Sequence, residues 1–282
     1  PMNLNQRIRS EARGRLRNNW GPALGITGIL IAGNFVIALL AELGYYLTGL
    51  MTSFGMMDLA AAIRAGGIPL AGFFLVPVAC AVLALLLLAP LWLGFVRWMS
   101  FLARGERLDA EAVFSYYLPA NYGAALRFSC AFFLRIAGWA ALCLLPGAAF
   151  AGVSALAGSG SLSLPAAIVN LFDVLGGTLE LGGVILLFNR VLQYFAAPFL
   201  FVTRGAVSES IALSVRVMNG YKSSVLRLLL SFLGWALLCV FAFPLIYVLP
   251  YITETLLVAA KWIVYNYENY PQTVSSTGFV SQ

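Results

Sequence analysis

The chain has 282 residues, of which 61% are hydrophobic and 10% are charged, and its formal net charge is +6 at pH 7. Because soluble domains carry about 25% charged residues, this composition excludes an ordinary water-soluble protein and indicates an all-α membrane protein. Histidine is absent and no two of the four cysteines have CxxC spacing, which argues against zinc sites, disulfides and histidine-dependent catalysis.

The first predicted element is an amphipathic helix over residues 6–19. Ile8, Ala12 and Leu16 share one face of this helix, and arginines surround the rest of it. Such a helix is typical of the headgroup plane, where arginine attracts anionic lipid. Trp20 follows directly, and indole rings favour the membrane interface. We therefore predict an interfacial helix that leads into the first membrane span.

Six transmembrane helices are predicted after it, because apolar stretches of about membrane length alternate with charged connectors. They cover residues 21–47, 69–103, 124–149, 168–203, 224–248 and 252–265. The second and fourth are longer than a span needs, so we expect them to project beyond the membrane on the cytoplasmic side. Further amphipathic segments are expected at 108–122 and 207–218, and outer turns at 158–163 and 249–251.

An internal repeat is predicted from two dipeptides one hundred residues apart, Arg104-Gly105 and Arg204-Gly205, each of which closes a long apolar stretch. In the stretches that follow, residues 138–143 (GWAALC) match residues 234–239 (GWALLC) at five of six positions. Coincidence in a low-complexity apolar sequence is the alternative.

The repeat predicts three parallel hairpin units, each preceded by an amphipathic interfacial helix. The units cover about 6–103, 104–203 and 204–265. Together they form a single six-span membrane domain over residues 1–265, which a loose polar tail over residues 266–282 follows.

Thirteen of the 17 basic residues gather in three clusters, which lie before the first span, between the second and third, and between the fourth and fifth. Under the positive-inside rule these clusters and both termini face the cytoplasm. We expect contacts with anionic lipid headgroups from Arg7, Arg9, Arg13, Arg15, Arg17, Arg104 and Arg204. The alternative is that they only determine topology. Nucleic-acid binding is not expected, because the basic residues alternate with spans and do not form one stripe.

Three features resemble a known family: residues 18–21 (NNWG) after the arginine-rich helix, residues 214–222 before 231–235 (SFLGW), and residues 249–251 (LPY). In these features the chain is similar to the bacterial integral-membrane proteins catalogued as domain of unknown function 975. It resembles more distantly the membrane domain attached to some glycerophosphodiester phosphodiesterases. The first resemblance implies a six-span protein of the bacterial cytoplasmic membrane, and neither implies a catalytic residue.

Ionisable side chains within the predicted spans are candidate functional groups, because inserting each one into the membrane costs about 2.5–3.5 kcal/mol. The candidate intramembrane polar site consists of Arg135, Asp173, Glu180, Arg190, Glu254 and Lys261. Asp173 and Glu180 share a helix face, and Arg135 is the candidate partner of Glu180. The alternative is that these charges only fix helix packing.

An enzyme is not expected. A rhomboid-type protease would need a histidine, an aspartyl intramembrane protease would need a GxGD-like motif, and no P-loop ends in Gly-Lys-Ser/Thr. No cofactor or metal is predicted either. The leading hypothesis is an inner-membrane protein that transports or handles a lipid-like or small amphipathic molecule. The alternative is a membrane scaffold that binds anionic lipid or a partner protein through its basic interfacial helices.

Overall fold

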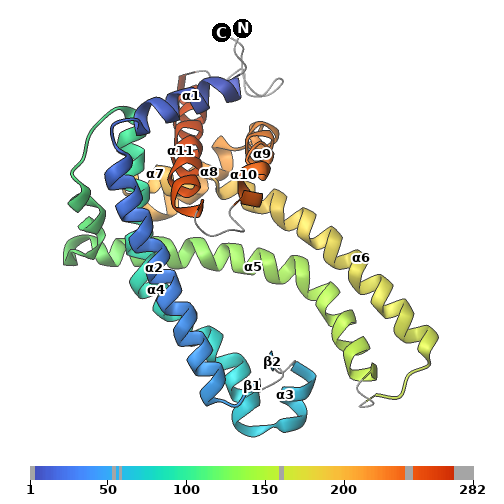
Figure 1. The fold of residues 1–282 in the computed structure, drawn as a ribbon. Coiled ribbons are helices and arrows are strands. Elements are labelled where there is room, and N and C mark those ends of the chain that lie inside the picture. Colours follow the sequence, from blue (N-terminus) through green and yellow to red (C-terminus); the bar gives the residue numbers. More distant parts are fainter. Residues whose placement is uncertain (1–3, 53–54, 57–58, 159–161, 239–243, 270–282) are drawn as a thin grey trace. The chain divides into compact units, whose positions relative to one another are not determined.

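The computed structural model describes residues 4–52, 55–56, 59–158, 162–238 and 244–269, and these are almost entirely helical (Figure 1). The all-α prediction is confirmed, with a two-residue antiparallel hairpin as an addition. In chain order the elements are α1 (Leu4–Leu16), α2 (Trp20–Leu47), β1 (Met51–Thr52), β2 (Gly55–Met56), α3 (Leu59–Ala65), α4 (Gly67–Arg104), η1 (Ala110–Tyr117), α5 (Pro119–Gly158), α6 (Ala166–Val191), η2 (Leu192–Tyr194), α7 (Ala197–Arg204), α8 (Val207–Val217), α9 (Lys222–Leu230), α10 (Leu233–Leu238) and α11 (Leu245–Asn269).

Two of the three predicted amphipathic segments form α-helices, α1 and α8. The third differs, because residues 110–117 form the 3-10 helix η1 and Leu118 is extended, with φ −65° and ψ 138°. Pro119 then begins α5. The residue before a proline disfavours the helical region, so one continuous helix cannot run through Leu118.

The described residues contain five helical stretches that are long and apolar enough to cross a membrane, one fewer than the six that we predicted. They are Trp20–Leu47, Gly67–Arg104, Pro119–Gly158, Ala166–Arg204 and Leu245–Asn269. The predicted span 224–248 divides into α9 and α10, and residues 239–243 lie outside the described part. Between α9 and α10 the Ser231 hydroxyl donates a hydrogen bond to the Leu228 carbonyl, and such side-chain hydrogen bonds compete with continuation of the helix.

The turn predicted for residues 249–251 is wrong, because Pro250 lies inside α11. Proline beyond the first turn removes one backbone hydrogen bond of a helix, so other contacts must offset its cost. Tyr251 packs edge-on against Phe232, with ring centroids 5.8 Å apart, and against Trp235 at 6.3 Å. This packing holds the segment in a helix despite its local turn signal. The helix continues to Asn269, and residues 270–282 of the predicted tail lie outside the described part.

The chain divides into two compact units, each assembled from segments far apart in sequence. Unit 1 comprises Pro1–Gly33, Leu86–Phe132 and Val191–Gln282, and unit 2 comprises Asn34–Leu85 and Phe133–Arg190. The boundaries fall inside long helices, so they do not coincide with those of the three predicted repeat units.

Unit 1 contains the buried hydrophobic cluster, which draws on α1, α4, α7, α9 and α11. Phe128 stacks on Phe201 with ring centroids 4.2 Å apart and planes 12° apart. Gly94 of α4 lies against η1 so closely that a Cβ there would be 1.7 Å from the Val113 carbonyl oxygen. A glycine is therefore needed where these two backbones meet.

Unit 2 consists of parts of two helical hairpins. The first is the end of α2 with the start of α4, and the second is the later part of α5 with α6. Glycines allow close approach in each hairpin. A Cβ on Gly44 would lie 2.9 Å from the Val76 side chain, and one on Gly183 would lie 2.2 Å from the Cys143 backbone oxygen. Small residues at helix contacts are typical of membrane proteins, where close packing replaces the hydrophobic effect between helices.

The repeated Arg-Gly dipeptides are helix stops. Gly105 (φ 87°) follows α4 and Gly205 (φ 79°) follows α7, and both adopt the left-handed conformation that glycine tolerates. The Gly205 N–H donates to the Phe201 carbonyl at 2.8 Å, and the Gly105 N–H donates to Leu102 at 2.9 Å. The dipeptides thus have a common structural role, while the three-unit repeat stays a prediction.

Candidate functional site

Helix α1 is held against the core of unit 1 by the face that the sequence identified. Ile8 is 2% exposed, and Ala12 and Leu16 are fully buried. Ile8 packs with Ala259 and Ile263 of α11 around a void of about 10 Å³. The apolar face that we expected to lie among lipid headgroups is therefore covered by protein, because α11 presents small side chains against which α1 fits.

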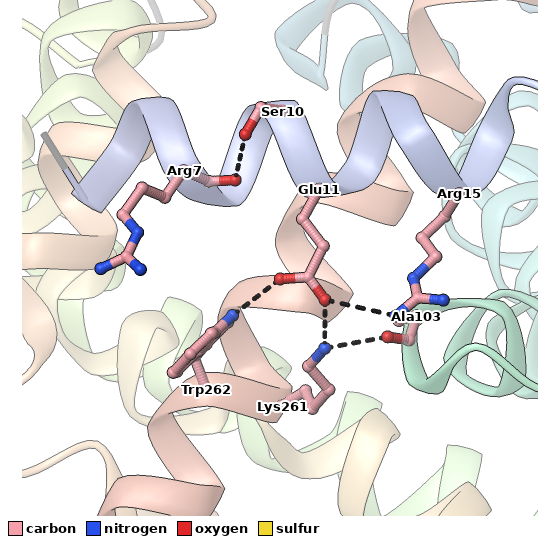
Figure 2. Close-up of polar contacts among 7 residues, drawn as sticks. All are labelled: Arg7, Ser10, Glu11, Arg15, Ala103, Lys261 and Trp262. Atoms are coloured by element: carbon pink, nitrogen blue, oxygen red, sulfur yellow. Dashed lines mark hydrogen bonds and ion pairs between the residues drawn. The ribbon is translucent and has the colours of Figure 1, made fainter. Parts of the chain in front are cut away.

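A cluster of polar side chains also fixes α1 in place. The Glu11 cluster comprises Glu11, Arg15, Lys261, Trp262 and the carbonyl of Ala103 (Figure 2). Lys261 Nζ donates to Glu11 Oε1 and, at 2.9 Å, to the Ala103 carbonyl at the end of α4. Trp262 Nε1 donates to Glu11 Oε2 at 3.0 Å, and Arg15 lies 3.8 Å from Glu11. The cluster therefore joins α1, α4 and α11.

These contacts also set the charge state of Glu11. Burial by itself raises the pKa of Glu11, but hydrogen bonds from Lys261 and Trp262 and the charges of Lys261 and Arg15 together lower it below its ordinary value. Glu11 is thus a carboxylate at neutral pH, and it compensates the partly buried ammonium group of Lys261. Sequence reasoning missed Glu11, although it is the only acidic residue before Glu42 and its position four residues from Arg15 was a signal.

The seven arginines predicted to contact headgroups fall into different environments. Arg15, Arg104 and Arg204 each pair with a carboxylate, from Glu11, Glu106 and Glu268 respectively. Arg9 contacts Ser231 and lies 4.9 Å over the Phe232 ring. Arg7, Arg13 and Arg17 are exposed.

Arg13 and Arg17 share a surface hollow of about 450 Å³, which Gly14 and Trp20 also line. Among the described residues neither arginine takes part in an ion pair. The hollow lies where α1 ends and α2 begins. It is therefore a basic surface that retains its positive charge.

The predicted intramembrane site is distributed over both units. Arg135, Asp173, Glu180 and Arg190 lie in unit 2, where each is exposed, and Glu254 and Lys261 lie in unit 1. The Arg190 guanidinium lies 4.4 Å over the Trp139 ring. Pairing of Arg135 with Glu180 stays a prediction. Neither the void at Ile8 nor the hollow at Arg13 is lined by any of these six residues.

Glu254 is the most deeply buried ionisable residue of the predicted site. Its side chain is fully buried, and neither carboxylate oxygen has a hydrogen-bond partner among the described residues. Since an unpaired buried polar group costs free energy, Glu254 is a weak point of the core.

The fold and the site together fit one class of protein. It is a helical membrane protein with a basic surface in unit 1, where α1 ends and α2 begins. The chain belongs to the family described as "Protein of unknown function (DUF975)", which matches residues 2–263. No curated protein and no solved structure gives a match. Nothing in these comparisons supports the more distant similarity to glycerophosphodiester phosphodiesterases.

Proposed function

We propose that this protein is a multi-pass scaffold of the bacterial cytoplasmic membrane that binds anionic lipid through helix α1. The observation that carries the proposal is the anchoring of α1. Its apolar face and Glu11 are engaged by α11, whereas Arg7 and Arg13 of α1 and Arg17 directly after it are exposed. A helix anchored in this way binds lipid by charge and not by insertion.

The proposed topology places three helix ends and α1 at the cytoplasmic surface. Lys261 joins α1 to the end of α4 through Glu11 and Ala103, and Arg204 at the end of α7 pairs with Glu268 in the last turn of α11. These contacts bring together, within unit 1, the segments that the positive-inside rule assigns to one side. They support the placement of both termini on the cytoplasmic side.

Charge-driven binding has a measurable signature. Each arginine near an anionic surface contributes about 1 kcal/mol, and salt screens this attraction. We expect phosphatidylglycerol to raise the unfolding temperature of the full-length protein in nanodiscs above its value in phosphatidylcholine alone. High salt should remove the difference, and so should the triple variant Arg7→Gln, Arg13→Gln, Arg17→Gln. Equal unfolding temperatures in the two lipids at low salt would refute the proposal.

A second candidate function, transport of an amphipathic molecule, is favoured by one observation. Arg135, Asp173, Glu180 and Arg190 are exposed on a hairpin of membrane length, where contact with lipid would cost about 2.5–3.5 kcal/mol each. A polar path around them would remove this cost. The test is translocation of a fluorescent phosphatidylglycerol in proteoliposomes. Transport requires that Glu180→Gln and Arg135→Gln slow it, whereas unchanged rates would exclude this path.

A further inference from the structure

The hollow at the junction of α1 and α2 has the composition of a site for a single phosphate group. Arg13 lies in the last turn of α1 and Arg17 directly follows that helix, with its N–H donating to the Arg13 carbonyl at 3.0 Å, and both residues line the hollow. Guanidinium groups bind phosphate through paired hydrogen bonds. Two guanidinium groups beside one hollow can therefore hold one phosphate from two directions.

Neighbouring contacts leave these two arginines available to a ligand. Arg15, between them in sequence, is directed to Glu11 (Figure 2). Arg13 Nε donates to the Tyr251 hydroxyl at 3.4 Å, and the guanidinium lies 5.8 Å over the same ring. That contact uses one donor and fixes the direction of the side chain, so the terminal nitrogens of Arg13 remain for an anion.

Gly14 and Trp20 give the hollow its shape. A Cβ on Gly14 would meet no atom within 4 Å, so the space beside it is open. Trp20 also lines the hollow and begins the apolar helix α2. A phosphate in the hollow thus lies next to an indole ring and an apolar helix. These neighbours suit a hydrocarbon chain as well as a headgroup.

We propose that this hollow is a discrete binding site for the phosphate of an anionic glycerophospholipid, formed by Arg13 and Arg17. The inference rests on the proposed function and deepens it. General attraction to the membrane surface would involve the exposed arginines Arg7, Arg13 and Arg17 equally. A discrete site distinguishes Arg17 from Arg7, because only Arg17 lines the hollow. A discrete site also requires that the space beside Gly14 stays open for the ligand.

The experiment measures binding of short-chain phosphatidylglycerol to the full-length protein in an uncharged detergent, followed by tryptophan fluorescence. Arg17→Gln should weaken binding about tenfold or more, since it removes charge-assisted hydrogen bonds. Gly14→Gln should have a comparable effect because it fills the hollow while keeping every charge. The matched controls are Arg7→Gln, which removes one charge elsewhere on α1, and Ser10→Gln, which adds the same amide on an exposed position of α1.

The outcomes separate the site from the broader proposal. Weakening by Arg17→Gln and Gly14→Gln that exceeds both controls supports the site. Equal weakening by Arg17→Gln and Arg7→Gln, with Gly14→Gln as wild type, overturns the site and leaves diffuse lipid binding in place. No preference of the wild-type protein for phosphatidylglycerol over phosphatidylcholine overturns both. Inorganic phosphate that binds as tightly as the lipid would show that the ligand is a soluble anion, which overturns the lipid assignment.

Discussion

Helices of the two units bury their apolar side chains to very different degrees, and the less buried helix is the more hydrophobic one. The most apolar stretch of α11, a helix of unit 1, is 56% buried with a mean hydropathy of 1.3. The corresponding stretch of α4, a helix whose first half, residues 67–85, belongs to unit 2, is 6% buried with a mean hydropathy of 2.7. A helix that packs inside protein can carry polar residues, whereas one that exposes its side chains needs lipid around it. The difference indicates that this stretch of α11 is surrounded mainly by protein and that this stretch of α4 is surrounded mainly by lipid.

The contacts that hold each unit together differ in the same way. Unit 1 uses aromatic stacking, buried aliphatic side chains and the Glu11 cluster. The hairpins of unit 2 rely on glycines that bring helix backbones together, such as Gly183 against Cys143. Packing without a hydrophobic driving force is expected in lipid.

The largest expected effect comes from the closest backbone contact of unit 1. In Gly94→Ala the new methyl group would lie 1.7 Å from the Val113 carbonyl oxygen, so α4 and η1 must separate. We expect a loss of about 3 kcal/mol of unfolding free energy. Hydrogen exchange of the detergent-solubilised protein should show faster exchange in η1. Gly123→Ala is the control, because its methyl group would meet no atom within 4 Å. Equal stability of the two variants would contradict the close approach.

The second prediction tests whether lipid surrounds unit 2. Val78 of α4 and Leu118, before α5, are 59% and 58% exposed, so lysine fits sterically at either position. In hydrocarbon a lysine costs about 3 kcal/mol, but in water almost nothing. Val78→Lys should therefore reduce the fraction of protein inserted in the membrane, measured by carbonate extraction, whereas Leu118→Lys should not. Equal insertion of the two variants would mean that the exposed surface of α4 is not in lipid.

Local features of the fold could be predicted from the sequence, and long-range ones could not. Periodicity identified the buried face of α1, and the dipeptide Arg204-Gly205 marked a helix end. An apolar stripe looks the same whether lipid or another helix covers it, so the role of α11 was not visible. Glu11 and Lys261 are 250 residues apart, and no local pattern links them. The predicted turn at Pro250 failed because tertiary packing of Tyr251 outweighed its local signal.

The third prediction concerns the glycine contact between α5 and α6. A methyl group in Gly183→Ala would lie 2.2 Å from the Cys143 backbone oxygen, whereas Gly182 has open space around it. We expect Gly183→Ala to cost about 2 kcal/mol and Gly182→Ala to be neutral or slightly stabilising. Thermal unfolding in detergent compares the two adjacent positions. If Gly182→Ala were the more damaging variant, the helix face assigned to this contact would be wrong.

The smallest effect concerns the Glu11 cluster and its dependence on pH. At neutral pH, Glu11→Gln should cost about 1–2 kcal/mol, because the Lys261 ammonium loses its carboxylate. The exposed pair of Arg104 and Glu106 provides the control, and Glu106→Gln should cost about 0.5 kcal/mol or less.

The sign of the pH dependence follows from the lowered pKa of Glu11. A carboxyl group whose pKa falls on folding stabilises the protein fully above its ordinary value of 4.5 and loses this contribution as the pH falls through its folded value. The wild-type protein should therefore approach the stability of Glu11→Gln at acidic pH, and hydrogen exchange should show α1 opening there first. A stability difference that stayed constant from neutral to acidic pH would mean that Glu11 acts through its shape and not through its charge. In that case the Glu11 side chain would help to hold α1 by packing, as Ile8, Ala12 and Leu16 do.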